Sequence, residues 1–255
     1  MNILFTICGR AGSKGFKNKN LKKLNGIPLV YYTLAAIRLY MDKYPENNIT
    51  VALNTDSKEL QKLVLSQKMV DNIVLAERKE DLAGDVAAKV SVIQDTYFQC
   101  GEKEDFDVIV DLDITSPMRR LCDIEAAIDG LLSDKNCDLV YSVVPARRSP
   151  YFNMVEKKDE YYRKICPSMY TARQQAPPSY ELNASIYAYS PKFLSGTIDK
   201  TILDYNCSIV VMPDYLVLDI DSEEDFEMME MLFGYFVKSD SGLQEVREAC
   251  NEKKN

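Results

Sequence analysis

The sequence contains no histidine, and this absence excludes several kinds of site. Ser-His triads, Cys-His proteases, histidine acid–base catalysis and zinc sites with a histidine ligand all need that residue. Glycine and proline number only 10 each among 255 residues, which excludes collagen-like and low-complexity chains. No apolar run reaches the roughly 18 residues that a membrane span needs. The first residues also lack the basic and apolar regions of a signal peptide, so we expect no membrane association.

Seven cysteines are scattered along the chain, and none form a C-x-x-C pair. A zinc site built from four cysteines is therefore not expected. An odd, scattered set is typical of free thiols in a reducing compartment, where they serve as small buried apolar residues. We therefore predict a cytoplasmic protein.

The charge is unevenly distributed. The net charge of -8 argues against a general nucleic-acid binder, which carries a broad basic face. Yet residues 1–41 hold seven basic residues and no acid, and six of the seven lie between positions 10 and 23. An acidic protein that gathers cations in one short loop is expected to bind a compact polyanion there. The alternative is a solvated basic loop.

The chain is 46% hydrophobic and 27% charged, a balance that suits one large α/β domain. Short apolar runs predict strands at 3–8, 49–54, 72–76, 106–113, 138–144, 183–190, 209–212 and 216–218. Helices are expected at 29–41, 58–68, 85–99, 123–132 and 222–238. This alternation predicts a three-layer α/β fold with a mostly parallel sheet.

The alternation breaks after residue 144. Residues 145–182 are rich in Pro, Tyr, Arg and Gln, and we expect a hairpin-like arm that leaves the sheet. Residues 1–238 are then a single domain with this arm inserted. The polar segment 239–255 is predicted to be a mobile tail.

A glycine-rich loop follows the first predicted strand directly. Its spacing, Gly9-x-x-Gly12-x-x-Gly15, matches neither the dinucleotide fingerprint nor the P-loop. Ligands of open α/β sheets bind beyond the carboxyl ends of the strands, however, and glycines let backbone N–H groups approach phosphate oxygens. Charge and hydrogen bonds would come from Arg10, Ser13, Lys14 and Lys19. We favour phosphate binding over a tight turn that merely needs glycine.

Several segments, taken in order, resemble the acylneuraminate cytidylyltransferases, which make CMP-activated sialic acids. They are residues 10–20 (RAGSKGFKNKN), 26–29 (GIPL), 115–119 (TSPMR), 183–187 (NASIY) and 219–225 (DIDSEED). Residues 145–153 (PARRSPYFN) and 171–175 (TARQQ) are most similar to the branch that acts on legionaminic acid, a bacterial nonulosonic acid. The resemblance covers roughly residues 1–233. It implies a Rossmann-like nucleotidyltransferase fold with a protruding dimerisation arm.

The resemblance implies the nucleotide site residue by residue. Gly9, Gly12, Arg10, Ser13, Lys14 and Lys19 would hold the triphosphate of CTP, with Asn20 beside the nucleotide. Segment 77–85 (ERKEDLAGD) is similar to the family's Arg-x-x-x-Leu-Ala-x-Asp element. It places Arg78 near the cytosine and Asp85 near the ribose or base.

Two Asp-x-Asp pairs, Asp111/Asp113 and Asp219/Asp221, stand at predicted strand ends. Residues i and i+2 of a strand face the same side, so each pair can converge on one hard cation. By resemblance Asp219 and Asp221 are the Mg²⁺ ligands, and with Arg10, Lys14 and Lys19 they form the catalytic set. The alternative role of Asp221 is to cap a helix.

The resemblance also implies a sugar site, comprising Asp113, Thr115, Arg173, Gln174, Asn183 and Tyr187. Arg173 is the candidate for the sugar carboxylate, because a guanidinium binds carboxylates bidentately. Asp113 departs from the family, whose sialic-acid enzymes have glutamine there. This acid argues against N-acetylneuraminate as substrate. Arg147 and Arg148 are assigned either to the sugar, to the folding of the arm or to a homodimer contact.

These observations predict an Mg²⁺-dependent enzyme that transfers CMP from CTP to a nine-carbon acidic sugar and releases pyrophosphate. Legionaminic acid is favoured over N-acetylneuraminic acid, pseudaminic acid and a ketodeoxyoctonate. A non-catalytic nucleotide-binding regulatory protein would bind CTP without releasing pyrophosphate. An RNA-binding module using residues 10–23 would bind long polyanions with strong salt dependence.

Overall fold

The computed structural model describes residues 1–12, 15–84, 88–101 and 105–251. Seven strands form the central sheet. They are β1 (Asn2–Cys8), β4 (Asn48–Asn54), β5 (Val74–Ala76), β6 (Val108–Leu112), β7 (Leu139–Pro145), β10 (Tyr180–Tyr189) and β11 (Cys207–Val211). Their order across the sheet is β11-β7-β10-β6-β1-β4-β5. The short strands β2 (Lys23–Leu24) and β3 (Ile27–Pro28) form a small hairpin before the first helix.

The sheet is mostly parallel, as the alternation of elements predicts. β1 pairs in parallel with β4 and β6, and β4 with β5. Only β10 runs antiparallel to its two neighbours, β6 and β7. The chain leaves the sheet at the end of β7 and returns as β10 from the opposite direction. The register of β10 against β7 shifts between Leu182 and Tyr187, and Ala184 lies there at a φ of 55°.

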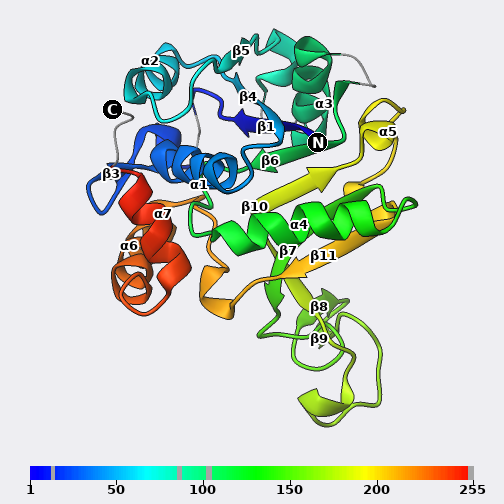
Figure 1. Ribbon diagram of the computed structural model, residues 1–255. Coiled ribbons are helices and arrows are strands. Elements are labelled where there is room, and N and C mark those ends of the chain that lie inside the picture. Colours follow the sequence, from blue (N-terminus) through cyan, green and yellow to red (C-terminus); the bar gives the residue numbers. More distant parts are fainter. Residues whose placement is uncertain (13–14, 85–87, 102–104, 252–255) are drawn as a thin grey trace.

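Alternate side chains of β1 enter the two faces of the sheet. Ile3, Phe5 and Ile7 belong to one hydrophobic core, and Leu4 belongs to the other. The first core lies under α1 (Leu29–Lys43), α2 (Lys58–Gln67), α4 (Leu121–Ser133), α6 (Glu223–Phe236) and α7 (Ser241–Ala249). The second lies under α3 (Lys89–Cys100) and α5 (Pro191–Leu194). The molecule therefore has the three layers expected (Figure 1).

Local sequence signals explain where several helices begin. Ser57 accepts a hydrogen bond from the Leu60 amide at the start of α2. Ser222 and Asp225 form a reciprocal capping box at the start of α6. Ser222, rather than Asp221, is thus the N-cap, so the Asp221 carboxylate is left for other contacts.

Two expectations about the C-terminal part are wrong. Residues 216–218 do not form a strand, because the chain turns through a 3-10 helix at Asp214–Leu216 and then runs without sheet pairing. Segment 239–251 is not a mobile tail. It contains α7, which packs against α1 and buries Leu243, Val246 and Cys250 in the larger core. The apolar spacing of α7 is short and interrupted by charge, so the segment appears polar in sequence.

The expected excursion at 145–182 leaves the sheet. It contains a small hairpin of β8 (Val155–Lys158) and β9 (Tyr161–Lys164), whose strands are largely exposed. The hairpin protrudes below the sheet in Figure 1. Both Nε and Nη2 of Arg147 pair with Asp214 at the root of the arm, the Nη2–Oδ2 distance being 2.5 Å. Arg147 therefore anchors the arm to the domain.

The helices in the described ranges include none that is both long and apolar enough to cross a membrane.

Candidate functional site

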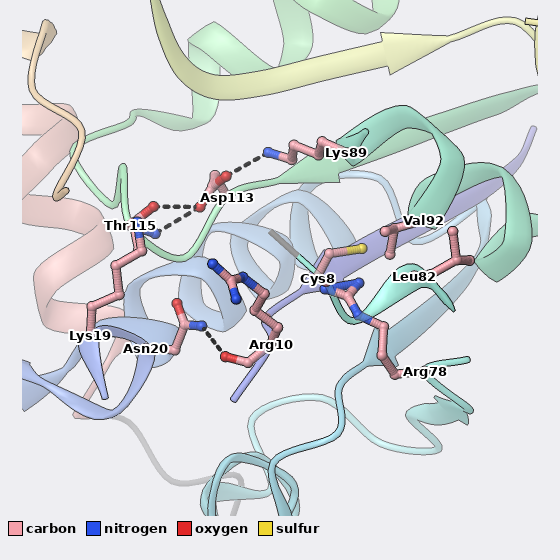
Figure 2. Close-up of a pocket in the computed structure, with 12 residues that line it drawn as sticks. Cys8, Arg10, Lys19, Asn20, Arg78, Leu82, Lys89, Val92, Asp113 and Thr115 are labelled. Atoms are coloured by element: carbon pink, nitrogen blue, oxygen red, sulfur yellow. Dashed lines mark hydrogen bonds and ion pairs between the residues drawn. The ribbon is translucent and has the colours of Figure 1, made fainter. Parts of the chain in front are cut away.

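A cavity of about 180 Å³ opens at the carboxyl ends of β1, β4 and β6, the edge of the sheet where the sequence predicts ligand binding. Four of the cavity's lining residues are cationic, which suits a polyanion. The lining comprises Cys8, Gly9, Arg10, Lys19, Asn20, Arg78, Leu82, Gly84, Lys89, Val92, Asp113 and Thr115. Figure 2 shows these side chains converging from the glycine-rich loop, the segment before α3 and the end of β6.

The glycine-rich loop passes close to its neighbours at two of its glycines. A Cβ on Gly9 would lie 2.8 Å and 2.9 Å from the side-chain ends of Ile114 and Leu60, which can shift, so the close approach is stricter at Gly15. A Cβ on Gly15 would lie 2.8 Å from the backbone oxygen of Asp221. The loop is therefore packed directly against segment 219–221, which carries the late aspartates Asp219 and Asp221. Ser13 and Lys14, which the sequence assigns to the triphosphate, lie outside the described residues.

Lys19 links the two halves of the candidate site. Its Nζ donates to the Ile220 carbonyl at 2.8 Å and to Asp221 Oδ1 at 2.9 Å. Asn20 follows it, and Nδ2 of Asn20 donates to the Arg10 carbonyl at 3.0 Å, which fixes the loop backbone. The cations near residue 19 and the carboxylates near residue 220 are 200 positions apart in sequence. The fold brings them into contact through Lys19, which itself lines the cavity.

Asp219 is held at the same edge by the loop that follows β6. The Ser116 hydroxyl donates to Asp219 Oδ1 at 3.1 Å, and the Ile220 amide donates to the Thr115 carbonyl. Burial and the nearby charge of Asp113 raise the pKa of Asp219 above its usual value. The negative potential at Asp219 is thus incompletely compensated by the residues that the structure describes.

Arg119 organises this loop from below, and its side chain is fully buried. It donates to the Ser116 carbonyl at 2.6 Å, to Ser185 Oγ at 3.0 Å and also to the Asp113 carbonyl. Burial lowers the pKa of Arg119 to about 10, so its guanidinium stays protonated at neutral pH. The arginine of the TSPMR segment is therefore structural: it shapes the backbone that presents Asp113 and Thr115.

Sequence reasoning missed Lys89, the first residue of α3. Its Nζ lies 2.9 Å from Asp111 Oδ2 and 2.5 Å from Asp113 Oδ2. The cation that the Asp111/Asp113 pair requires is thus the ammonium of Lys89. Nothing in the local sequence marks this lysine, because the contact depends on how α3 lies over the sheet.

Arg78 lines the cavity beside Cys8, and its Nη1 donates to Asn54 Oδ1 at 3.2 Å. Burial and then the charge of Asp111 raise the pKa of the Cys8 thiol well above its usual value. Cys8 is therefore a neutral wall of the cavity rather than a nucleophile. Asp85, expected near the ribose or base, lies outside the described residues.

The residues expected to bind the sugar separate into two groups. Asp113 and Thr115 line the cavity, and the Tyr187 ring lies beneath the Lys89 ammonium, 4.8 Å from it. Arg173 lines instead a second hollow of about 310 Å³ at the root of the arm, together with Arg148. The side chain of Arg173 donates to the Ala146 carbonyl, and the neighbouring Gln174 is exposed.

Asn183 corrects one expectation. It is fully buried, its amide donates to the Leu216 carbonyl at 2.9 Å, and its oxygen accepts from Ser142 Oγ at 2.6 Å. Its hydrogen-bonding groups are engaged inside the protein, so it supports the sheet at the register shift of β10 and does not reach the sugar.

The donor set at the late aspartates suits a hard cation. Carboxylate oxygens are the ligands that Mg²⁺ prefers, and the raised pKa of Asp219 marks the negative potential that such an ion relieves. Asp221 is exposed and shares its charge with Lys19. Within the described ranges, no group of three or more His, Cys, Asp or Glu side chains gathers as a metal cluster.

Comparison with known proteins identifies the family. The family model for cytidylyltransferases matches residues 4–201. The chain is 36% identical to post-translational flagellin modification protein B of Campylobacter coli over 236 residues, which are 90% of this chain and 94% of that protein. It is 35% identical to CMP-N,N'-diacetyllegionaminic acid synthase of Campylobacter jejuni over 232 residues, again 90% of this chain and 94% of that protein.

A solved structure shares the fold. CMP:2-keto-3-deoxy-manno-octonic acid synthetase complexed with CTP superposes with a TM-score of 0.66 at 15% identity, covering 92% of this chain and 99% of that one. The predicted three-layer nucleotidyltransferase fold and the resemblance seen in the sequence are both confirmed.

Proposed function

The chain belongs to the cytidylyltransferase family, and on that premise we propose that it transfers CMP from CTP to the anomeric hydroxyl of a nonulosonic acid, with legionaminic acid as the preferred sugar. One observation carries the proposal. Lys19, which lines the cavity, donates to the Ile220 carbonyl and to Asp221, so the late carboxylates lie against a cationic residue of the cavity wall.

The chemistry follows from the charges around this cavity. The anomeric oxygen attacks the α-phosphorus of CTP, the bond to the β-phosphate oxygen breaks, and pyrophosphate leaves. Arg10 and Lys19 line the cavity and neutralise phosphate oxygens, whose negative charge would otherwise repel the incoming sugar. We assign the acceptance of the sugar hydroxyl proton to the Asp219 carboxylate.

We assign Mg²⁺ to Asp219 and Asp221. When bound, Mg²⁺ supplies positive charge that holds the triphosphate and stabilises the leaving pyrophosphate. Asp221 pairs with Lys19, which lines the cavity beside Arg10 and Asn20. We therefore propose that the ion binds at the phosphate end of the nucleotide.

The preference for legionaminic acid rests on two observations. The relative from Campylobacter jejuni carries that substrate in its name. Asp113 lines the cavity at the position where the family's sialic-acid enzymes have glutamine. N-acylneuraminate cytidylyltransferase of Streptococcus agalactiae is less similar, at 26% identity over 89% of this chain and 52% of that protein.

We further propose a cytoplasmic homodimer formed through the arm. Tyr161 and Tyr162 on β9 are 67% and 69% exposed, an aromatic surface typical of an interface core. Arg148 and Arg173 line the hollow at the arm root, where a paired arm would complete a carboxylate site. The cytoplasmic location is supported by seven cysteines that all carry free thiols.

A pyrophosphate-release assay tests the proposal directly. The protein is incubated with Mg²⁺ and either CTP, ATP, GTP or UTP, against a panel of legionaminic, N-acetylneuraminic, pseudaminic and ketodeoxyoctonic acids. We expect pyrophosphate release with CTP but not with ATP, GTP or UTP. Among the sugars, legionaminic acid should give the highest kcat/KM. A higher kcat/KM with another sugar would overturn the preference. CTP binding with no release from any sugar would support the non-catalytic alternative.

A further inference from the structure

Lys89 occupies an unusual place for a lysine. Thr6, Asp111 and Tyr187 are register neighbours across β1, β6 and β10, and Lys89 in the first turn of α3 lies over Asp111 and Tyr187. One third of the Lys89 side chain remains accessible, and the residue lines the cavity. Figure 2 shows its ammonium pointing to Asp113.

The cluster contains two carboxylates for one ammonium. The Asp111 side chain is fully buried, and its other oxygen accepts from Thr6 Oγ1 at 2.8 Å. Burial on its own lowers the pKa of Lys89, yet the charges of Asp111 and Asp113 outweigh it and raise that pKa. Lys89 is therefore charged at neutral pH.

Asp113 is clamped from two sides. Its Oδ1 accepts from the Thr115 amide at 2.9 Å and from Thr115 Oγ1 at 2.8 Å, while its Oδ2 receives the Lys89 ammonium. An ammonium has three N–H donors. One donates to Asp113 Oδ2, whereas Asp111 Oδ2 lies 2.9 Å from the ammonium as an ion pair without a hydrogen bond. Asp113 and Lys89 line the cavity beside Thr115, and we refer to this part of the lining as the floor.

We propose that Lys89 is a positioning residue for the sugar substrate: it fixes the Asp113 carboxylate and reduces the charge of the Asp111/Asp113 pair from two negative units to one. An anionic sugar would otherwise approach two uncompensated carboxylates in a low-dielectric site. The floor then presents one donor and one acceptor, which suit a neutral hydrogen-bonding substituent of the sugar rather than its carboxylate. This inference rests on the proposed function.

A purely structural role for Lys89 predicts a different result. An ammonium that merely ties α3 to the sheet would alter stability, and it would change the apparent affinities for CTP and sugar together. A positioning role acts through Asp113 and changes the sugar KM selectively. The two roles are separated by a double-mutant cycle between Lys89 and Asp113.

The experiment compares K89M, K89R, D113N and K89M/D113N with the wild type. K43M is the matched control, because Lys43 also forms an ion pair, with Glu125, and does not line the cavity. We expect K89M to raise the sugar KM about tenfold or more, which corresponds to about 1.4 kcal/mol, while CTP binding by calorimetry stays within about threefold. K89R and K43M should stay within about threefold for both, and K89M/D113N should raise the sugar KM no further than D113N alone, because Lys89 acts through Asp113.

Three outcomes would overturn the inference: an unchanged sugar KM in K89M, equal losses for sugar and CTP, or strictly additive effects of K89M and D113N. If K89M does not fold, D113N and K89R still test the inference. It requires a raised sugar KM in D113N and a near-normal sugar KM in K89R. Absence of pyrophosphate release from the wild type would instead refute the proposed function, so the two failures are distinguishable.

Discussion

The two Asp-x-Asp pairs have the same sequence spacing and opposite surroundings. Asp111 and Asp113 share the Lys89 ammonium, and Asp111 is fully buried. Asp219 has no such partner at hydrogen-bond distance among the described residues and receives the Ser116 hydroxyl, while Asp221 is 79% exposed and pairs with Lys19. The first pair is compensated inside the protein, and the second retains negative charge for a ligand. A motif supplies the donors, and the tertiary surroundings decide what they bind.

The largest effect is expected from removing the cation of the compensated pair. K89M leaves the fully buried Asp111 carboxylate without its ammonium, and breaking a buried ion pair costs about 3–5 kcal/mol. We expect a decrease of this size in the free energy of unfolding, measured by urea denaturation. D221N is the comparison, because an exposed pair contributes at most about 1 kcal/mol. Equal losses in the two variants would contradict the contrast between the pairs.

The uncompensated pair should matter for activity instead. D219N removes the proposed base and metal ligand, and loss of such a group typically lowers kcat about 100-fold or more. The measurement is pyrophosphate release over a range of Mg²⁺ concentrations, with thermal unfolding as the check on folding. D42N, which breaks the exposed pair with Arg38 on α1, should retain activity within about twofold. Unchanged kcat and Mg²⁺ dependence in D219N would reject the assignment.

The two pairs should also have opposite pH signatures. Burial raises the pKa of Asp113, but Lys89 and Thr115 outweigh it and lower that pKa to about 2. Because the folded-state pKa lies below the unfolded value, Asp113 contributes about 2 kcal/mol above pH 4, and this is lost as the pH falls to about 2. In D113N the free energy of unfolding should therefore change less with pH in this acid range than in the wild type.

Asp219 is the contrast, since burial and Asp113 raise its pKa. The contribution of Asp219 to the free energy of unfolding is present below its pKa in the unfolded state. This contribution is lost as the pH rises through its pKa in the folded state. Without Mg²⁺, D219N should therefore be more stable than the wild type near neutral pH.

An identical pH profile for D113N and wild type would show that Asp113 is not held by Lys89.

The smallest effect is expected from the hydroxyl that orients Asp219. S116A removes the hydrogen bond to Oδ1, and a bond to a charged group contributes about 1.5 kcal/mol. We expect the Mg²⁺ concentration for half-maximal rate to rise about fivefold to tenfold, with stability nearly unchanged. S66A, an exposed helix serine, serves as the control. A shift equal to that of S66A would place Ser116 outside the site.

The sequence determined the alternation of strands and helices, the break after residue 144 and the ordered segments that led to the family, because these depend on local apolar patterning and turn chemistry. The sequence did not predict that Arg173 lines a hollow separate from the cavity or that Asn183 forms hydrogen bonds inside the sheet. It also did not predict that segment 241–249 is a packed helix. Each of these depends on contacts between residues far apart in sequence.

The candidate site divides in the same way. Residue types alone indicated a cationic glycine loop and late carboxylates. The tertiary structure decided that Lys19 joins them and that Lys89 neutralises the first aspartate pair. The physical reason is that the protonation and the binding role of a charged side chain depend on neighbours within a few ångströms. In a parallel sheet those neighbours come from strand ends and helix starts that are far apart in the sequence.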